Sequence, residues 1–175
     1  MQHLFLMHAF QRLVDESNKF FQTADHLTYS TFPMVRDAKL LLVITENLFQ
    51  CLTKGMEAIV YYEKLYKRIT PINNDFYSLF DAFKEKCVPR YSFSRDAVMV
   101  IQDIKAVLDH RKKSPVEFRR GADRFIMADH DFRMQSLDIT RIKNYLQITK
   151  QFIFKLNSIH NKVAATYARG QQASK

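Results

Sequence analysis

The chain of 175 residues has little glycine and no tryptophan. It contains 3 glycines and 4 prolines, whereas glycine alone makes up about 7% of an average protein. Folds with many tight turns and glycine-rich phosphate loops are therefore disfavoured. The nucleotide-binding patterns G-x-G-x-x-G and G-x-x-x-x-G-K-[ST] are both absent, which excludes the familiar phosphate cradles.

Metal and disulfide chemistry also has little support in the sequence. Cys51 and Cys87 are the only cysteines, which is too few for a disulfide framework. The patterns C-x-x-C, H-E-x-x-H and E-x-x-H are absent, so we expect no metal and no cofactor. Asp129, His130 and Asp131 could bind a metal, but neighbouring side chains in an extended segment point to opposite faces. A polar turn is the favoured interpretation.

No stretch of the sequence predicts a membrane segment. No apolar run reaches the length of about 18 residues that a spanning helix needs. The first residues, MQHLFLMHAF, lack the basic start of a signal peptide. Unpaired cysteines suit a reducing compartment, so we expect a cytoplasmic protein with no membrane partner.

Apolar periodicity predicts an all-α, up-and-down helical bundle of about five helices. Hydrophobic residues make up 47% of the chain, enough for one core. We expect a single domain over 1–169 and a flexible tail over 170–175. The helical patterns cover 2–26, 37–69, 75–88, 94–112 and a last segment that Asp138 caps, with connectors around Pro33 and Pro89. The segment FIMADHDFRMQSL before the last helix could form a small β-hairpin or a loop.

The pattern over 37–69 is the longest and carries apolar residues on two faces. Leu41, Ile44 and Leu48 begin one stripe, and Leu40 and Val43 belong to a second. Such a helix lies at the centre of a bundle or buries one stripe in a homodimer or partner interface. Gly55 in its middle would allow a close helix crossing. Tyrosines at 61, 62 and 66 could stack on bases, but packing at the rim of the core is favoured.

Basic residues dominate the charge of the chain and gather before the last helix. The formal net charge is +9, which favours a polyanionic partner. The stretch DHRKKSPVEFRRGADRF at 109–125 supplies the candidate phosphate contacts, which are Arg111, Lys112, Lys113, Arg119, Arg120 and Arg124. Arginine offers bidentate geometry to phosphate. The alternative is a solvated cap, because cations also suit a helix C-terminus.

The helical pattern LFQCLTKGMEAIVYYEKL resembles the early helix of the HEPN superfamily of small helical bundles. That resemblance implies an often dimeric bundle and, in many members, a metal-independent ribonuclease with an arginine followed four to six residues later by a histidine. After Arg111, this interval holds Glu117 rather than histidine. Arg124 and His130 have the interval and are the catalytic candidates.

These observations favour a non-catalytic binding module that contacts RNA or a ribonucleoprotein through the basic loop before the last helix. Two alternatives stay open. The first is a ribonuclease in which Arg124 holds the phosphate and His130 does acid–base work. The second is a homo-oligomeric or partner-binding module that uses the helix at 37–69 and no nucleic acid.

Overall fold

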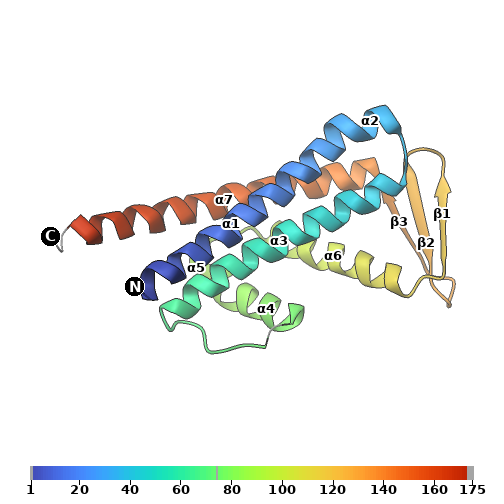
Figure 1. Cartoon of the computed structure of the whole chain (residues 1–175). Coiled ribbons are helices and arrows are strands. Elements are labelled where there is room, and N and C mark those ends of the chain that lie inside the picture. Colours follow the sequence, from blue (N-terminus) through green and yellow to red (C-terminus); the bar gives the residue numbers. More distant parts are fainter. Residues whose placement is uncertain (1, 74, 173–175) are drawn as a thin grey trace.

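The computed structural model describes residues 2–73 and 75–172, which form five continuous helical segments and one small sheet (Figure 1). The predicted helical bundle is confirmed, and so is the hairpin before the last helix. In chain order the elements are α1 (Gln2–His26), η1 (Leu27–Thr31), α2 (Phe32–Val35), α3 (Lys39–Leu65), α4 (Phe76–Ala82), η2 (Phe83–Cys87), α5 (Val88–Tyr91), α6 (Arg95–Lys112), β1 (Val116–Arg120), β2 (Arg124–Ala128), β3 (Met134–Asp138) and α7 (Ile139–Gln172).

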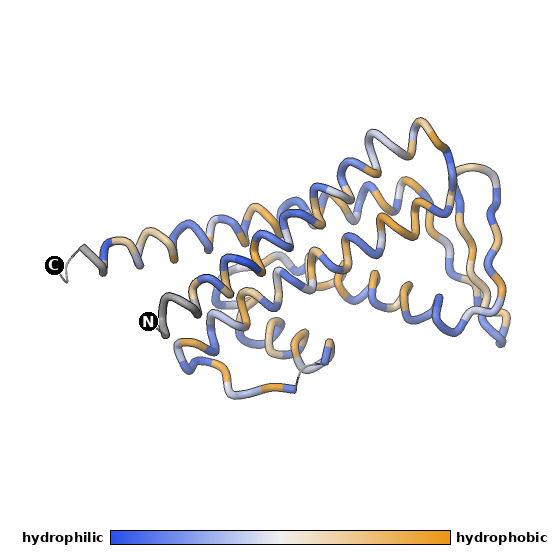
Figure 2. Tube along the Cα trace, viewed as in Figure 1, coloured by the Kyte–Doolittle hydropathy of each residue, from blue (hydrophilic) through white to orange (hydrophobic). Residues whose placement is uncertain are grey.

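Helix α3 is the centre of the bundle. It contacts α1, α4, α6 and α7, and it also touches β2 and β3. Figure 2 shows hydrophobic residues recurring along its whole length. Both apolar stripes predicted from the sequence are therefore largely used inside the chain. No helix in the described part of the chain is both long and apolar enough to cross a membrane.

Gly55 lets the long helices approach each other closely, as its position in the sequence predicted. A Cβ at this position would lie 2.4 Å from Cε1 of Phe152 on α7 and 3.2 Å from Oγ of Ser17 on α1. Phe152 is 2% exposed, so its ring has little room to move. The hydroxyl of Ser17 donates to the carbonyl of Cys51 at 2.7 Å, which joins α1 to α3 on the same side.

Two prolines that the sequence placed at helix breaks lie inside continuous helical segments. Pro33 and Pro89 each belong to a four-residue α-turn, α2 or α5, that follows a five-residue π-helical stretch, η1 or η2. Proline lacks an N–H and clashes with the carbonyl four residues earlier. The wider π turns change the hydrogen-bond register just before each proline. The segments end instead at Arg36 and Ser92, with φ of 49° and 54°, so the connectors predicted at the two prolines are wrong.

The antiparallel sheet has the order β1-β2-β3 and covers one end of the bundle. Phe125, Met127 and Leu137 are buried on its inner face. Strands β2 and β3 match the predicted hairpin, but β1 was expected to be a basic loop. All five residues of β1 are exposed, so this strand has no buried apolar alternation for sequence reasoning to detect. Helix α7 includes Gln172, and residues 173–175 of the predicted tail lie outside the described residues.

Arg141 ties the sheet and α7 to α6. Its Nη2 donates to both carboxylate oxygens of Asp103 at 3.0 Å, and its Nη1 donates to the carbonyl of Ser136 at 2.7 Å. Its Nε donates to the hydroxyl of Tyr145, which in turn donates to Asp103. Burial raises the pKa of Tyr145, and the hydrogen bond to Asp103 raises it further. Asp138 accepts from the backbone N–H of Arg141 at 2.8 Å and caps α7, as the sequence predicted.

The substitution Gly55→Ala tests the close approach of the helices. Alanine favours the helix by about 1 kcal/mol, but the added methyl group overlaps the buried ring of Phe152. We expect a net loss of about 1–2 kcal/mol in the free energy of unfolding, measured by urea denaturation. In a Phe152→Leu background the loss should shrink, because the smaller side chain makes room. A rise in stability for the single variant would contradict the crossing.

The substitution Arg141→Lys tests the link between the sheet and α6. Lysine keeps the charge but cannot reproduce the fork that reaches Asp103 and Ser136 together. We expect urea denaturation to show a loss of about 1–3 kcal/mol in the free energy of unfolding. The matched control is Arg169→Lys, because Arg169 is exposed near the end of α7. Equal unfolding midpoints for the two variants would contradict the role of Arg141.

Candidate nucleic-acid interface

The six cations predicted to contact phosphate belong to the end of α6 and to β1 and β2, which lie at one end of the bundle (Figure 1). Arg111 and Lys112 belong to the last turn of α6, and Lys113 is its C-cap residue. The remaining three are Arg119 and Arg120 on β1 and Arg124 at the start of β2. The structure thus brings the predicted residues to one region, but it divides them into two groups with different surroundings.

Arg111 and Arg119 are engaged in ion pairs that hold β1 against the bundle. Arg111 Nη1 lies 2.6 Å from Oε1 of Glu46 on α3, and its Nε lies 3.1 Å from Oε1 of Glu117 on β1. Arg119 Nη1 lies 3.3 Å from Oδ1 of Asp37, just before α3. These two arginines are already partly neutralised, so they are better placed to position the sheet than to bind phosphate.

The pKa of Asp37 lies below its usual value, which keeps its pair with Arg119 intact at neutral pH. The main cause is the backbone N–H of Lys39, which donates to Asp37 Oδ1 at 2.9 Å, and the charge of Arg119 adds to it. A lowered pKa means that the pair is present above the ordinary carboxyl pKa. It is lost only as the pH falls through the lowered value.

The other four cations, Lys112, Lys113, Arg120 and Arg124, are exposed, and none has an ion-pair partner among residues 2–73 and 75–172. Arg120 and Arg124 are directly opposite each other in the β1–β2 register. Lys112 and Lys113 lie near the other end of β1, so about 13 Å of strand separates the two pairs. Two pairs at this spacing suit an extended polyanion better than a single phosphate.

The alternation of β1 sorts its side chains onto two faces. Glu117 and Arg119 lie on the inner face. There Glu117 pairs with Arg111 of α6, and Arg119 pairs with Asp37. Val116, Phe118 and Arg120 lie on the outer face. Val116 is 52% exposed and Phe118 is 44% exposed. We call this surface, with Arg124, Lys112 and Lys113, the outer basic face.

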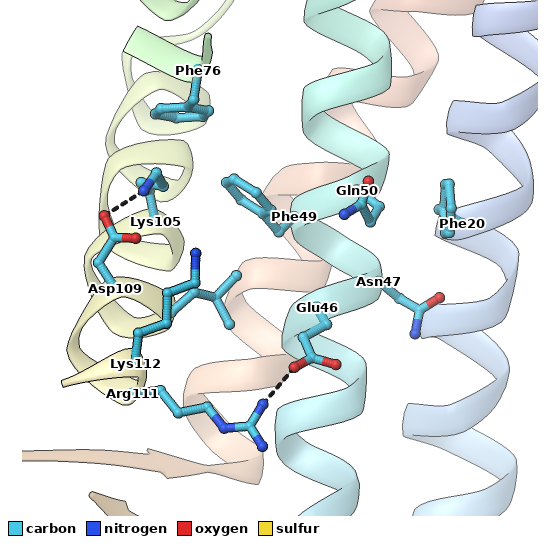
Figure 3. Close-up of a pocket in the computed structure, with 11 residues that line it drawn as sticks. Phe20, Glu46, Asn47, Phe49, Gln50, Phe76, Lys105, Asp109, Arg111 and Lys112 are labelled. Atoms are coloured by element: carbon cyan, nitrogen blue, oxygen red, sulfur yellow. Dashed lines mark hydrogen bonds and ion pairs between the residues drawn. The ribbon is translucent and has the colours of Figure 1, made fainter. Parts of the chain in front are cut away.

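A cavity of about 600 Å³ opens beside the outer basic face, between α3 and α6 (Figure 3). Phe49 and Phe76 approach each other across it, with ring centroids 5.4 Å apart. Lys105 lies 5.3 Å from the Phe76 ring and pairs with Asp109. Arg111 and Lys112 also line the cavity, which makes it continuous with the basic residues. The carboxylates of Glu46 and Asp109 also line the cavity, where they pair with Arg111 and Lys105. The aromatic walls can stack on a planar ring.

The sequence did not predict this cavity, because its residues come from separate helical patterns. Three tyrosines at the end of α3, at 61, 62 and 66, carried the stacking alternative in the sequence. Those tyrosines favour packing, since the ring of Tyr62 lies 5.3 Å from Phe10 and 4.9 Å from Tyr66. The sequence does hold one signal for the cavity. Phe49 lies among polar residues of α3, including Asn47 and Gln50, which also line the cavity.

Arg124 and His130, the two catalytic candidates, are not brought together. Arg124 begins β2, and Ala128 at its end is about 13 Å away at the usual rise per residue. His130 lies beyond it in an exposed turn. Asp129 shapes this turn by accepting from the backbone N–H groups of Asp131 and Arg133, each at 2.9 Å. Within the described residues, no group of three histidine, cysteine or acidic side chains could hold a metal ion.

The second apolar stripe of α3 is not available as a continuous interface. Val60 is buried and Leu40 is half-buried, while Val43 is 41% exposed. The stripe is therefore interrupted by intramolecular packing. A homodimer or partner interface on this helix stays a prediction, and it would have to use side chains other than this stripe.

The chain was compared with models of protein families, with curated proteins and with solved structures, and none of these comparisons found a match.

Proposed function

We propose that this chain is a non-catalytic binding module that contacts RNA through the outer basic face. The observation that carries the proposal is the group of four exposed cations, Lys112, Lys113, Arg120 and Arg124, which lack carboxylate partners in the described part of the chain. Arg120 and its cross-strand partner Arg124 share a face of the sheet with the exposed ring of Phe118, which lies on an edge strand. Cations bind the phosphate backbone and release counterions, while an exposed aromatic ring stacks on an unpaired base.

Single-stranded RNA fits this surface better than a duplex. Stacking on Phe118 requires a base that is not held inside a helix. The neighbouring cavity between α3 and α6 offers a second aromatic site, at Phe49 and Phe76, that a splayed base could enter. The arrangement supplies positioning and stacking groups. Because Arg124 and His130 lie at opposite ends of β2, they do not form a pair that could act on one phosphodiester.

Charge reversal on the outer basic face tests the phosphate contacts. In the variant Arg120→Glu/Arg124→Glu, we expect the affinity for a labelled single-stranded RNA of about 20 nucleotides to fall at least tenfold. The slope of log affinity against log salt should flatten by about 1.4, because two phosphate contacts are lost at about 0.7 each. Fluorescence anisotropy at several salt concentrations measures both quantities.

The matched control is Lys84→Glu/Lys86→Glu, which makes the same change of charge at exposed positions of η2. We expect this control to retain most of the affinity. An equal loss in the two variants would mean that net charge alone drives binding. Unchanged affinity in the variant Arg120→Glu/Arg124→Glu would contradict the proposal.

The substitution Phe118→Ala tests the stacking contact. Loss of one base–aromatic stack costs about 1–3 kcal/mol, so we expect an affinity about 5–150 times weaker. The salt slope should stay the same, since no charge is removed. Phe154→Ala on α7 is the control, because Phe154 is 64% exposed and lies outside the outer basic face. If Phe118→Ala binds RNA as well as this control does, the ring makes no contact with a base.

A further inference from the structure

A second basic cavity lies between the end of α3, α5 and α7. Figure 1 shows α5 and this end of α3 at the end of the bundle opposite the sheet. Its volume is about 360 Å³, and four cations line it, namely Arg68, Arg90, Lys155 and Lys162. None of the described residues that line it is acidic. Helix α7 contributes the two lysines and contains no aspartate or glutamate from Ile139 to Gln172. The cavity is therefore strongly positive.

One buried carboxylate, Glu63, lies beneath this cavity and organises its arginines. Glu63 is 1% exposed. Arg68 Nη1 lies 3.1 Å from its Oε1, and Arg90 Nε lies 3.5 Å from its Oε2. The hydroxyl of Tyr91 also donates to Oε1. Burial raises the pKa of Tyr91, and the hydrogen bond to Glu63 raises it further, so Tyr91 stays a neutral donor.

Glu63 neutralises only part of the positive charge around the cavity. A buried carboxylate requires compensation, and the two arginines already supply more than one charge. Lys155 and Lys162 have no ion-pair partner in the described part of the chain. Neither Nη nitrogen of Arg90 is used in its contact with Glu63, which involves Nε. These groups leave several donors beside the cavity from two separate segments, α5 and α7.

We propose that this cavity binds a phosphate dianion, either as inorganic phosphate or as the phosphate group of a small monoester. A phosphate group carries nearly two negative charges and three acceptor oxygens at neutral pH. It matches the forked donors of arginine together with the point charges of lysine. The hydroxyls of Ser92 and Ser158 also line the cavity and can donate to it. The volume is near the lower end for small-molecule sites.

The proposal is independent of the outer basic face. Helix α3 has 27 residues, so about 40 Å separates its two ends. The outer basic face lies at one end and this cavity at the other. The variant Arg120→Glu/Arg124→Glu should therefore bind phosphate as the wild type does, whether or not it has lost RNA.

An NMR titration of the full chain with inorganic phosphate at pH 7.5, against sodium chloride at matched ionic strength, tests the site. We expect saturable shifts of the backbone amides of Tyr91, Ser92 and Ser158, with a dissociation constant of about 1 mM or below. Lys155→Gln and Lys162→Gln should each weaken binding about tenfold, as expected for one lost charge-assisted hydrogen bond. Lys162 is exposed, so its replacement should not disturb folding.

Lys150→Gln is the matched control, because Lys150 is exposed on the same helix but does not line the cavity. It should bind phosphate within about twofold of the wild type, since exposed charges at a distance are largely screened.

Parallel titrations with ribose 5-phosphate, and with ribose, which lacks the phosphate group, distinguish a phosphate monoester from free phosphate. Tighter binding of ribose 5-phosphate than of phosphate indicates a monoester, and equal binding indicates free phosphate. Absence of saturable shifts up to about 50 mM phosphate, or equal losses in Lys150→Gln and Lys155→Gln, would overturn the proposal.

Discussion

The close contact between Gly55 and Phe152 is the constraint on which the rest of the structure depends. It lets α7 cross α3 at a distance that a side chain at position 55 would prevent. Because α7 follows β3 without a break, the seating of α7 also determines where the small sheet lies. Arg141 then fastens this junction to α6 through Asp103. The surface at the sheet end is thus supported by packing in the middle of the bundle.

The alternation of β1 decides what each charged residue of the basic segment does. Arg119 faces the bundle and is held by Asp37, while Arg120, its neighbour in sequence, lies on the outer face opposite Arg124. Two arginines that look alike in the sequence therefore have different surroundings. One positions the strand and the other is available to a ligand. A loop would not separate them in this way.

Positive charge gathers at both ends of α3. At one end it accompanies exposed aromatic and aliphatic side chains on a sheet edge, which suits a flexible chain of nucleotides. At the other end it surrounds a cavity built over a buried glutamate, which suits one compact anion. The two proposed modes of recognition thus differ in the shape of the surface rather than in its composition.

The sequence by itself determined the bundle, because periodic apolar residues must share a buried face. It also located the cap at Asp138, the glycine crossing and the hairpin over β2 and β3. It could not reveal β1, whose residues are all exposed, or the π turns before Pro33 and Pro89, which depend on the hydrogen-bond register of neighbouring turns. Only the tertiary structure paired Arg111 with Glu46, separated Arg124 from His130, and gathered Arg68, Arg90 and Lys155 around one cavity. Such contacts join residues far apart in the chain, and no local pattern records which of them will meet.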